Sequence, residues 1–423
     1  MKKLIVIGLA AISISCSAQA IKHERKVRGF GDTAAADSLD VYGILQNNAP
    51  GDFPTSGVPY ATLIGKGGKF IIGAGGFVKA VAGWDVGHPI DNVDEFITSQ
   101  IPMGDMDGDG SRFGFSARQT HLYVNFVALP GTSNELGAFV GANFLSDDYT
   151  PVLQYAYLKY RGLKAGYDNT LFSDPACGAP SIDYEGPSSN TCNPVGGISY
   201  TWNRGHWEAG GGIELPQASF TTVNGKTKWV YQRVPDIPVA GQYSWGGGNS
   251  WVRTTAILRT LTYRDLAAGK NHSKLGYGFQ ISGAEQFLDC LTFYWQGVWG
   301  KGIGSMIQDT QDEGLDMTPV NGGQSLSPVM VWGGFLALRY DISSRFVAST
   351  TYSQMRTYAR DFTGGTTEWG DLYKYAQYVN TNVFFSATPY LEIGLEYIWG
   401  RRTNNDGNQA ADNRIQTSFQ LTF

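Results

Sequence analysis

Short segments in which apolar and polar residues alternate recur along most of the chain, and this pattern limits the possible folds more than any other feature. The stretch RIQTSFQLTF (414–423) is typical, with an apolar or small side chain at every second position. A period of two belongs to a β-strand with two different faces, whereas a helix repeats every 3.6 residues. Turn residues separate the segments, as expected for successive strands. The chain is therefore predicted to be all-β.

The connections between the segments alternate in length. About 16 segments can be counted between residues 69 and 423. Every second connection between successive segments is short, as in PGTSN and DISS. The long, polar connections are 85–112, 169–196, 300–327 and 358–374. An even number of strands, with short turns at one end and long loops at the other, is typical of bacterial transmembrane barrels. A β-sandwich or propeller also has many short strands, but it does not predict this alternation.

Aromatic residues stand at the ends of the segments. Trp84 closes the first one, Trp202 and Trp207 flank an NRG turn, and Tyr390 and Trp399 bracket the penultimate one. Aromatic girdles at both membrane interfaces are expected of transmembrane barrels. The mean hydropathy of only −0.20 agrees with this, because alternation hides a lipid-facing surface from averages. We predict a 16-stranded antiparallel transmembrane β-barrel over residues 69–423, with short periplasmic turns and long extracellular loops.

The N-terminus predicts export. Residues 1–20 combine two lysines, an apolar run and an Ala-Gln-Ala site, which is typical of a cleaved signal peptide. A lipoprotein signal with Cys16 lipidated is the alternative, although Ser13 stands where leucine is usual. Residues 21–68 show no strand pattern and are interpreted as a periplasmic leader. The expected location is the outer membrane of a Gram-negative bacterium.

Three cysteines follow the signal peptide. Cys177 and Cys192 lie in one loop-like stretch, and an exported protein can form disulfides, so we predict a bridge between them. Cys290 would then remain as a small packed thiol within a strand.

The alternation also assigns charged residues to the lumen. Outward placement of a charge at the bilayer midplane would cost about 2–4 kcal/mol, so the cations of the strands are expected to point inward. Together they predict a cationic constriction that favours anions. Loop 169–196 is predicted to fold inward, with Asp174, Asp183 and Glu185 facing the basic wall. A bulge near 116–119 is needed to turn one of these cations, Arg118, inward. The seven candidates are Lys79, Arg118, Lys164, Arg253, Arg259, Arg339 and Arg414.

The stretches GAGGFVKAVAGWD, SARQTHLYVNF and AYLKYRGLKAGYDNTLFSD resemble the DcaP-like porins. The resemblance covers most of 69–175 and includes a G-x-x-x-G-x-x-x-T-x-F-x-D entry to the constriction loop, formed by Gly162, Gly166, Thr170, Phe172 and Asp174. It implies a trimeric, 16-stranded outer-membrane porin for small, preferentially anionic solutes. It also implies that Lys79, Arg118 and Lys164 line the pore.

One motif suggests a metal. Asp105, Asp107 and Asp109 have the D-x-D-x-D-G spacing of a calcium loop, but Ser116 stands at the twelfth position, where glutamate is the usual ligand. An exposed acidic loop is the alternative, and no other cofactor is expected. The histidines are scattered and no G-x-S-x-G occurs, so an enzyme is not expected. The chain also lacks the basic stripe of a nucleic-acid-binding protein.

These observations predict an outer-membrane porin for passive diffusion of small hydrophilic, preferentially anionic solutes. The alternatives are a substrate-specific or gated channel, with residues 21–65 as a plug, and a surface adhesin or scaffold. Expected partners are outer-membrane lipid, lipopolysaccharide and the barrel assembly machinery. That machinery would read the last strand through Phe419, Leu421 and Phe423.

Overall fold

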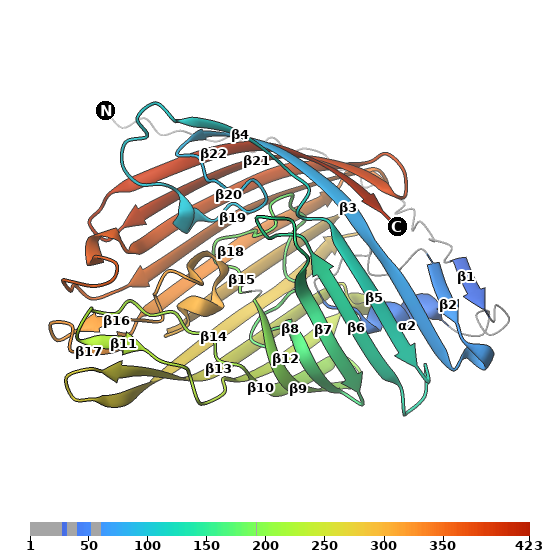
Figure 1. Ribbon diagram of the computed structural model, residues 1–423. Helices are drawn as coiled ribbons and strands as arrows, with labels where there is room; N and C mark the ends of the chain where they lie inside the picture. The colour runs from blue at the N-terminus through green and yellow to red at the C-terminus, as the bar shows by residue number, and fades with distance from the viewer. Residues whose placement is uncertain (1–27, 32–39, 52–60, 192) are drawn as a thin grey trace.

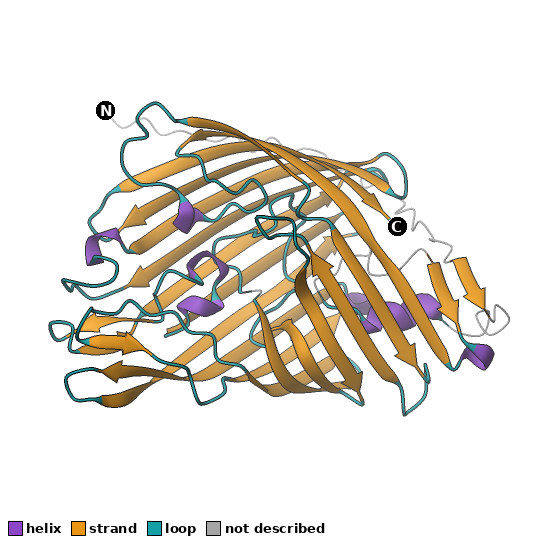
Figure 2. Cartoon of the chain, in the orientation of Figure 1, coloured by secondary structure: helices purple, strands orange, loops and turns teal. Residues whose placement is uncertain are grey.

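The computed structural model describes residues 28–31, 40–51, 61–191 and 193–423. The predicted signal peptide, Cys16 and Cys192 lie outside these ranges. Strands dominate the described chain (Figure 2). None of the helices in these ranges is long and apolar enough to cross a membrane.

Sixteen antiparallel strands form a closed barrel (Figure 1). β4 and β5 both pair with β3 and together make the second strand, and β22 pairs with β3 to close the barrel. The barrel strands are β3 (Phe70–Gly87), β4 (Ser111–Ser116), β5 (His121–Ala128), β6 (Leu136–Asn143), β7 (Val152–Tyr160), β8 (Leu163–Asn169), β9 (Pro194–Arg204), β10 (Trp207–Glu214), β12 (Ile237–Trp245), β13 (Ser250–Asp265), β14 (Lys270–Leu288), β15 (Leu291–Lys301), β18 (Met330–Asp341), β19 (Phe346–Tyr358), β20 (Tyr373–Ser386), β21 (Leu391–Asn404) and β22 (Gln409–Thr422). The predicted fold class is confirmed.

The remaining elements lie in the loops and in the N-terminal segment. They are β1 (Arg28–Gly31), α2 (Val41–Asn48), β2 (Ala61–Ile64), η2 (Lys66–Gly68), η3 (Thr98–Gln100), β11 (Thr227–Trp229), η4 (Gly246–Gly248), η5 (Gly304–Met306), η6 (Gln308–Thr310), β16 (Met317–Val320), β17 (Ser325–Pro328) and η7 (Trp369–Asp371). β2 pairs with β3 at the periplasmic end of the seam, below the last residue of β22.

A bulge interrupts the second strand. Val81 of β3 lies opposite Ser116, but Phe77 lies opposite His121, so the second strand has one residue more than β3 in this interval. The exposed, outward-facing aromatic and aliphatic side chains have odd numbers in β4 and even numbers in β5. Both observations agree with the predicted bulge, because an unpaired extra residue shifts the side-chain alternation by one.

Three external loops fold into the lumen, namely 88–110, 170–193 and 302–316. Their apolar side chains are buried against the inner wall, as Phe172, Ile303 and Ile307 show. The loops also contact one another, because Asn193 donates to the Ser305 carbonyl at 2.8 Å and the Gln308 amide donates to the Asn190 carbonyl at 2.9 Å. The inward fold of loop 169–196 was expected from the sequence, whereas the other two were not.

Candidate pore and its lining

The alternation of each strand places its predicted pore residue on the inner face. In β3, for example, Val78 is 49% exposed on the outer wall, whereas Lys79 is 9% exposed. The outward residues of β22 include Phe419 and Leu421, which are half exposed, while Gln416 and Ser418 are buried inside. This follows from the period of two, because a charged side chain turned outward would lie in lipid.

Lys79 and Arg253 hold the constriction loop against the wall. The Lys79 ammonium group donates to the Ile182 carbonyl at 3.3 Å. Arg253 donates to the carbonyls of Ser173 at 3.1 Å and Leu171 at 3.3 Å, and it pairs with Glu208 at 3.2 Å. Arg253 therefore binds the beginning of the loop and Lys79 binds its middle.

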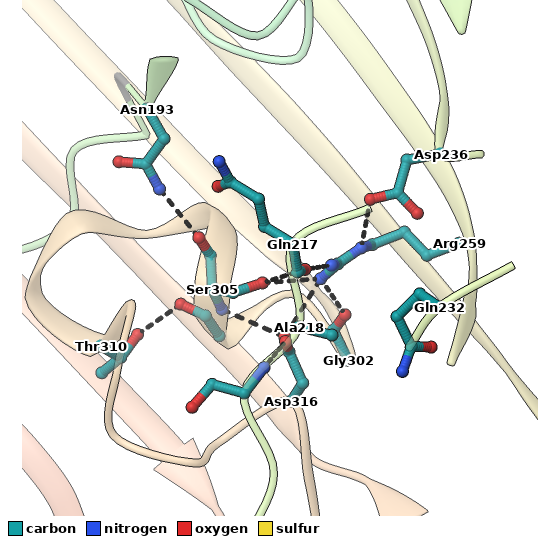
Figure 3. Close-up of polar contacts among 12 residues, drawn as sticks. Asn193, Gln217, Ala218, Gln232, Asp236, Arg259, Gly302, Ser305, Thr310 and Asp316 are labelled. Atoms are coloured by element: carbon teal, nitrogen blue, oxygen red, sulfur yellow. Dashed lines mark hydrogen bonds and ion pairs between the residues drawn. The ribbon is translucent and has the colours of Figure 1, made fainter. Parts of the chain in front are cut away.

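Arg259 joins two further loops to β13 (Figure 3). Its guanidinium group is fully buried and pairs with Asp236 at 3.0 Å and Asp316 at 3.1 Å. It also donates to the Gly302 carbonyl at 2.7 Å and to the Ser305 hydroxyl at 3.1 Å. Two carboxylates neutralise this cation. Its partners in Figure 3 come from the loop before β12 and from the loop after β15.

Arg118 and Arg414 bind the first external loop. Arg118, in the bulge, donates to Asp94 at 2.8 Å and to Asp147 at 3.1 Å. Arg414 pairs with Asp85 at 2.5 Å, and its guanidinium also donates to the carbonyls of Asn92 at 2.9 Å and Val93 at 3.2 Å.

The two remaining candidates are less buried and pair within their own strands. Lys164 pairs with Asp168, and Arg339 pairs with Asp341 at 2.9 Å. Six of the seven predicted pore cations are thus in ion pairs with described carboxylates. Their selection of anions stays a prediction, and the contacts show that most of them position loops.

Asp174 and Asp183 of the constriction loop form no ion pair with the described cations of the wall, so the expected pairing is absent, although the charge of Arg414 acts on Asp183. Asp174 accepts from the Trp251 indole at 3.0 Å and the Ser282 hydroxyl at 2.7 Å. Asp183 accepts from the Phe96 amide at 2.8 Å and the Tyr378 hydroxyl at 2.7 Å. Neutral donors therefore hold both carboxylates in place.

Burial raises the pKa of several loop carboxyl groups. The pKa of Asp183 is raised to about 7 by burial and by the nearby Glu396 carboxylate. Burial also raises the pKa of Asp309, to about 6. This carboxylate accepts a hydrogen bond from the Thr98 amide at 2.7 Å. The pKa of Glu185 is raised well above its usual range by burial and then by Glu95. These carboxyl groups lie where the inward loops meet.

The predicted bridge between Cys177 and Cys192 is wrong. Cys177 is a free, buried thiol that donates to the carbonyls of Trp295 at 3.2 Å and Gly283 at 3.4 Å. It packs with Phe335 on the inner wall. Cys290, expected as a packed thiol, is disulfide-bonded.

The calcium motif gains no support. Asp105, Asp107 and Asp109 are exposed, and Asp105 accepts from the Asp107 amide at 3.2 Å within the turn. Across the described ranges, no group of three or more His, Cys, Asp or Glu side chains is placed to hold a metal ion.

Helix α2 lies inside the periplasmic end of the barrel, next to β5 and β6 (Figure 1). Asn48 donates to the Asn125 side chain at 2.6 Å, and Asn125 donates back to the Leu45 carbonyl at 2.8 Å. At the helix C-terminus, Tyr157 donates to the Asn48 carbonyl at 2.8 Å and Lys159 donates to the same carbonyl at 3.3 Å. A cation suits this end of a helix, where carbonyl groups are unpaired and the dipole is negative. The segment is therefore bound to the lumen wall.

A polar wall remains open to water on β7 to β12. Several inward-facing side chains there, such as Lys159, Lys164 and Gln242, are partly exposed, although Tyr155 and Tyr157 of β7 are buried; most of those on β18 to β22 are covered by the loops. The charges on the open wall are mixed and lie close together: Lys159 and Lys164 are direct cross-strand neighbours, and the carboxylates on the same wall are Asp168 and Glu208.

Sequence reasoning missed several residues that shape the lumen. Asn48 contacts the Asn125 side chain, while Lys159 and Asp309 contact helix and loop backbone, and no local pattern reveals such partners. A signal was available for two missed residues outside the lumen, because Arg356 and Arg401 interrupt the apolar outer faces of β19 and β21.

Comparison with known proteins gives structural relatives only. No family model matches the chain, and no curated protein matches it. The outer membrane channel DcaP of Acinetobacter baumannii is 16% identical, with a TM-score of 0.70, over 84% of this chain and 97% of that one. An anion-selective porin from Comamonas acidovorans is 10% identical, with a TM-score of 0.54, over 84% and 100%. The trimer form of OmpT from Vibrio cholerae is 11% identical, with a TM-score of 0.51, over 84% and 99%. At these identities the similarity shows a shared fold.

Proposed function

We propose that this chain is an outer-membrane porin of a Gram-negative bacterium and lets small hydrophilic solutes diffuse passively. The observation that carries the proposal is a closed 16-stranded barrel that keeps a water-exposed polar wall on β7 to β12 beside the inward loops. The outer face, with exposed side chains such as Leu336 and Phe419, fits lipid. The similar structures named above include an outer membrane channel and a porin, which supports the same interpretation. A homotrimer is part of the proposal.

The finer part of the proposal is a modest preference for anions. Lys159 and Lys164 are the cations nearest to the open wall, but Asp168 pairs with Lys164 and Glu208 faces the same lumen. Mixed charges at close range reduce the net field on a passing ion. We therefore expect selectivity to be weaker than a ring of unpaired lysine and arginine side chains would give.

Planar-bilayer recording tests both parts. Purified protein should give stepwise conductance, and a salt gradient should give a reversal potential slightly displaced toward that of the anion. The variant Lys164→Gln should shift the reversal potential toward the cation, because this lysine lies on the open wall and is partly exposed. Absence of conductance steps from folded protein would contradict the porin proposal, and an unchanged reversal potential would contradict the anion preference alone.

The position of α2 favours a gated channel as the second candidate. A helix bound to the lumen wall through Asn48 and Lys159 narrows the periplasmic mouth while it stays bound. A gated channel would switch between two conductance levels in one recording, and removal of the helix would leave the larger level only.

A further inference from the structure

Two arginines face outward at the external end of the barrel. In β19 the inward residues Ser353, Met355 and Thr357 are buried, so Arg356 belongs to the outer face with Tyr352 and Tyr358. In β21, Arg401 follows the outward residues Leu395 and Tyr397 by the same alternation. A cation on the lipid face is unusual, because at the bilayer midplane it costs about 2–4 kcal/mol.

Their height explains why they are tolerated. Arg356 stands ten residues above Phe346, and Arg401 stands ten residues above Leu391, where both strands begin at short turns. With a rise of about 3.3 Å per residue and a tilt of about 40°, both lie about 25 Å above the periplasmic edge. This is the external border of the apolar band, where lipid head groups begin.

The two guanidinium groups share one patch. Arg356 lies opposite Tyr375 of β20, and Arg401 lies opposite Gln377, two residues further along the same outward face. Both act electrostatically on the Tyr375 phenol. About 10 Å of sheet separates β19 from β21, a span that two long side chains can close around one anionic group.

The patch is held in place but its charge is not compensated. The Arg356 guanidinium lies 4.9 Å from the centre of the Tyr358 ring, and Arg401 donates to the Gln377 side chain. The Nε atoms of both arginines are buried without a hydrogen-bond partner in the described structure, and neither arginine is in an ion pair there. This contrasts with the lumen, where carboxylates neutralise six of seven predicted cations. Buried guanidinium donors without an acceptor are costly, so an anion is expected at this place.

We propose that Arg356 and Arg401 bind phosphate groups of the glycolipid in the external leaflet, lipopolysaccharide. The proposal rests on the outer-membrane location proposed above. Guanidinium groups match phosphate in charge and in their planar donor geometry. Below the arginines, exposed Tyr352, Leu395 and Tyr397 offer an apolar surface for acyl chains. A second copy of the chain fits less well, because it would bury two like charges without a partner.

The experiment measures binding of lipid A to the full-length protein in detergent. Wild type is compared with the double variant Arg356→Gln, Arg401→Gln and with Arg345→Gln, which changes an exposed arginine at a periplasmic turn. The double variant should bind lipid A at least about tenfold more weakly, the loss expected for one charge-assisted hydrogen bond, and Arg345→Gln should bind like wild type. Heat-modifiable migration on gels confirms that each variant is folded.

Two further lipids test the chemistry of the patch. Dephosphorylated lipid A should bind wild type and double variant equally weakly, and phosphatidylglycerol should bind wild type more weakly than lipid A. Equal binding of lipid A by double variant and wild type, or undiminished binding of either of these two lipids by wild type, would overturn the proposal. Loss of self-association without loss of lipid A binding would also overturn it and identify a subunit contact. Conductance should be the same in double variant and wild type, so failure of the porin proposal would be recognised separately.

Discussion

Arg259 connects two external loops to the barrel wall through one guanidinium group. Asp236 ends the loop before β12, and Asp316 belongs to the inward loop after β15. All three side chains are almost completely buried, so water does not stabilise any one of them in the absence of the others. The charge of Arg259 therefore stabilises the external half of the barrel and is not accessible to a solute.

Replacement of Arg259 should be strongly destabilising. Arg259→Met leaves two buried carboxylates without a cationic partner, which should cost about 3–5 kcal/mol in the free energy of unfolding. Thermal unfolding in detergent measures the loss. Arg339→Met is the matched control, because its pair with Asp341 is more than a quarter exposed on both sides and should contribute less than about 1 kcal/mol. Equal effects of the two substitutions would show that burial of the Arg259 pairs has no special role.

Asp183 should make the contact between loop 88–110 and the constriction loop sensitive to pH. Its pKa is raised to about 7 by burial and by Glu396, so the folded state binds a proton that the opened loop releases. A raised carboxyl pKa favours the closed loops below the unfolded value near 4, and this advantage is lost as pH rises through about 7. The neutral groups that face Asp183 are Phe96 and Tyr378, and the charged ones are Lys79, Glu185, Glu396 and Arg414.

Hydrogen exchange of the Phe96 amide measures this effect. After correction for intrinsic rates, its protection should fall by roughly 10- to 100-fold between pH 5 and pH 7. Asp183→Asn should remove most of the pH dependence, because asparagine does not titrate in this range. The same slope in wild type and variant would assign the pH dependence to another group.

At the scale of elements, helix α2 is the part of the fold that most directly affects the periplasmic mouth. Asp40 caps its first turn by accepting from the Gly43 amide at 2.9 Å, and Leu45 packs against Ile71 and Val127 of the inner wall. An isolated helix of eight residues is marginal in water, so these contacts decide whether it forms. The helix and its binding site on the wall are therefore expected to form together.

Removal of the Asn48 side chain should release the helix. Asn48→Ala leaves Asn125 with an unpaired buried oxygen, a cost of about 1–3 kcal/mol, and the freed mouth should raise the single-channel conductance. Deletion of residues 40–49 should raise it at least as much. Tyr42→Ala is the control, because Tyr42 is exposed on the same helix. An unchanged conductance after the deletion would show that α2 does not narrow the pathway of ions.

The strands could be predicted from the sequence because each carries its own signal. Every strand has two faces with different surroundings, and this difference repeats every second residue, as in RIQTSFQLTF. The bulge near Arg118 was also visible, since the alternation changes there. The inward fold of loops 88–110 and 302–316 was not predictable in this way. It depends on single contacts between distant residues, such as Thr98 with Asp309, and these leave no periodic trace.

The same distinction explains the errors at the candidate pore. The alternation of inward and outward residues correctly assigned Lys79 and Arg253 to the inner face. It does not reveal which groups of other segments contact these two side chains. Their partners are loop carbonyls and Glu208, and these come from other parts of the chain. Spacing within one loop likewise suggested a Cys177 bridge, whereas the folded loop directs this thiol to the wall.

At the scale of the whole molecule, closure of the barrel depends on one seam. β22 pairs with β3 along eleven residue pairs, from Asp412 opposite Gly87 to Thr422 opposite Phe77. Phe423 extends the seam, because its amide donates to the Gly76 carbonyl and its carbonyl accepts from the Gly76 amide, both at 3.0 Å. A barrel without this pairing would leave strand edges in lipid, where unpaired backbone groups cost several kcal/mol each.

Deletion of Phe423 should therefore affect assembly more than transport. It removes two seam hydrogen bonds and one outward aromatic ring, but no inward side chain of the pore. We expect lower amounts of folded protein in the outer membrane and unchanged conductance of the molecules that insert. Phe423→Ala separates the ring from the backbone bonds, and Phe385→Ala removes an aromatic ring from β20, away from the seam. Surface labelling measures the folded amount, and a normal amount after deletion of Phe423 would show that the seam closes without its last pair.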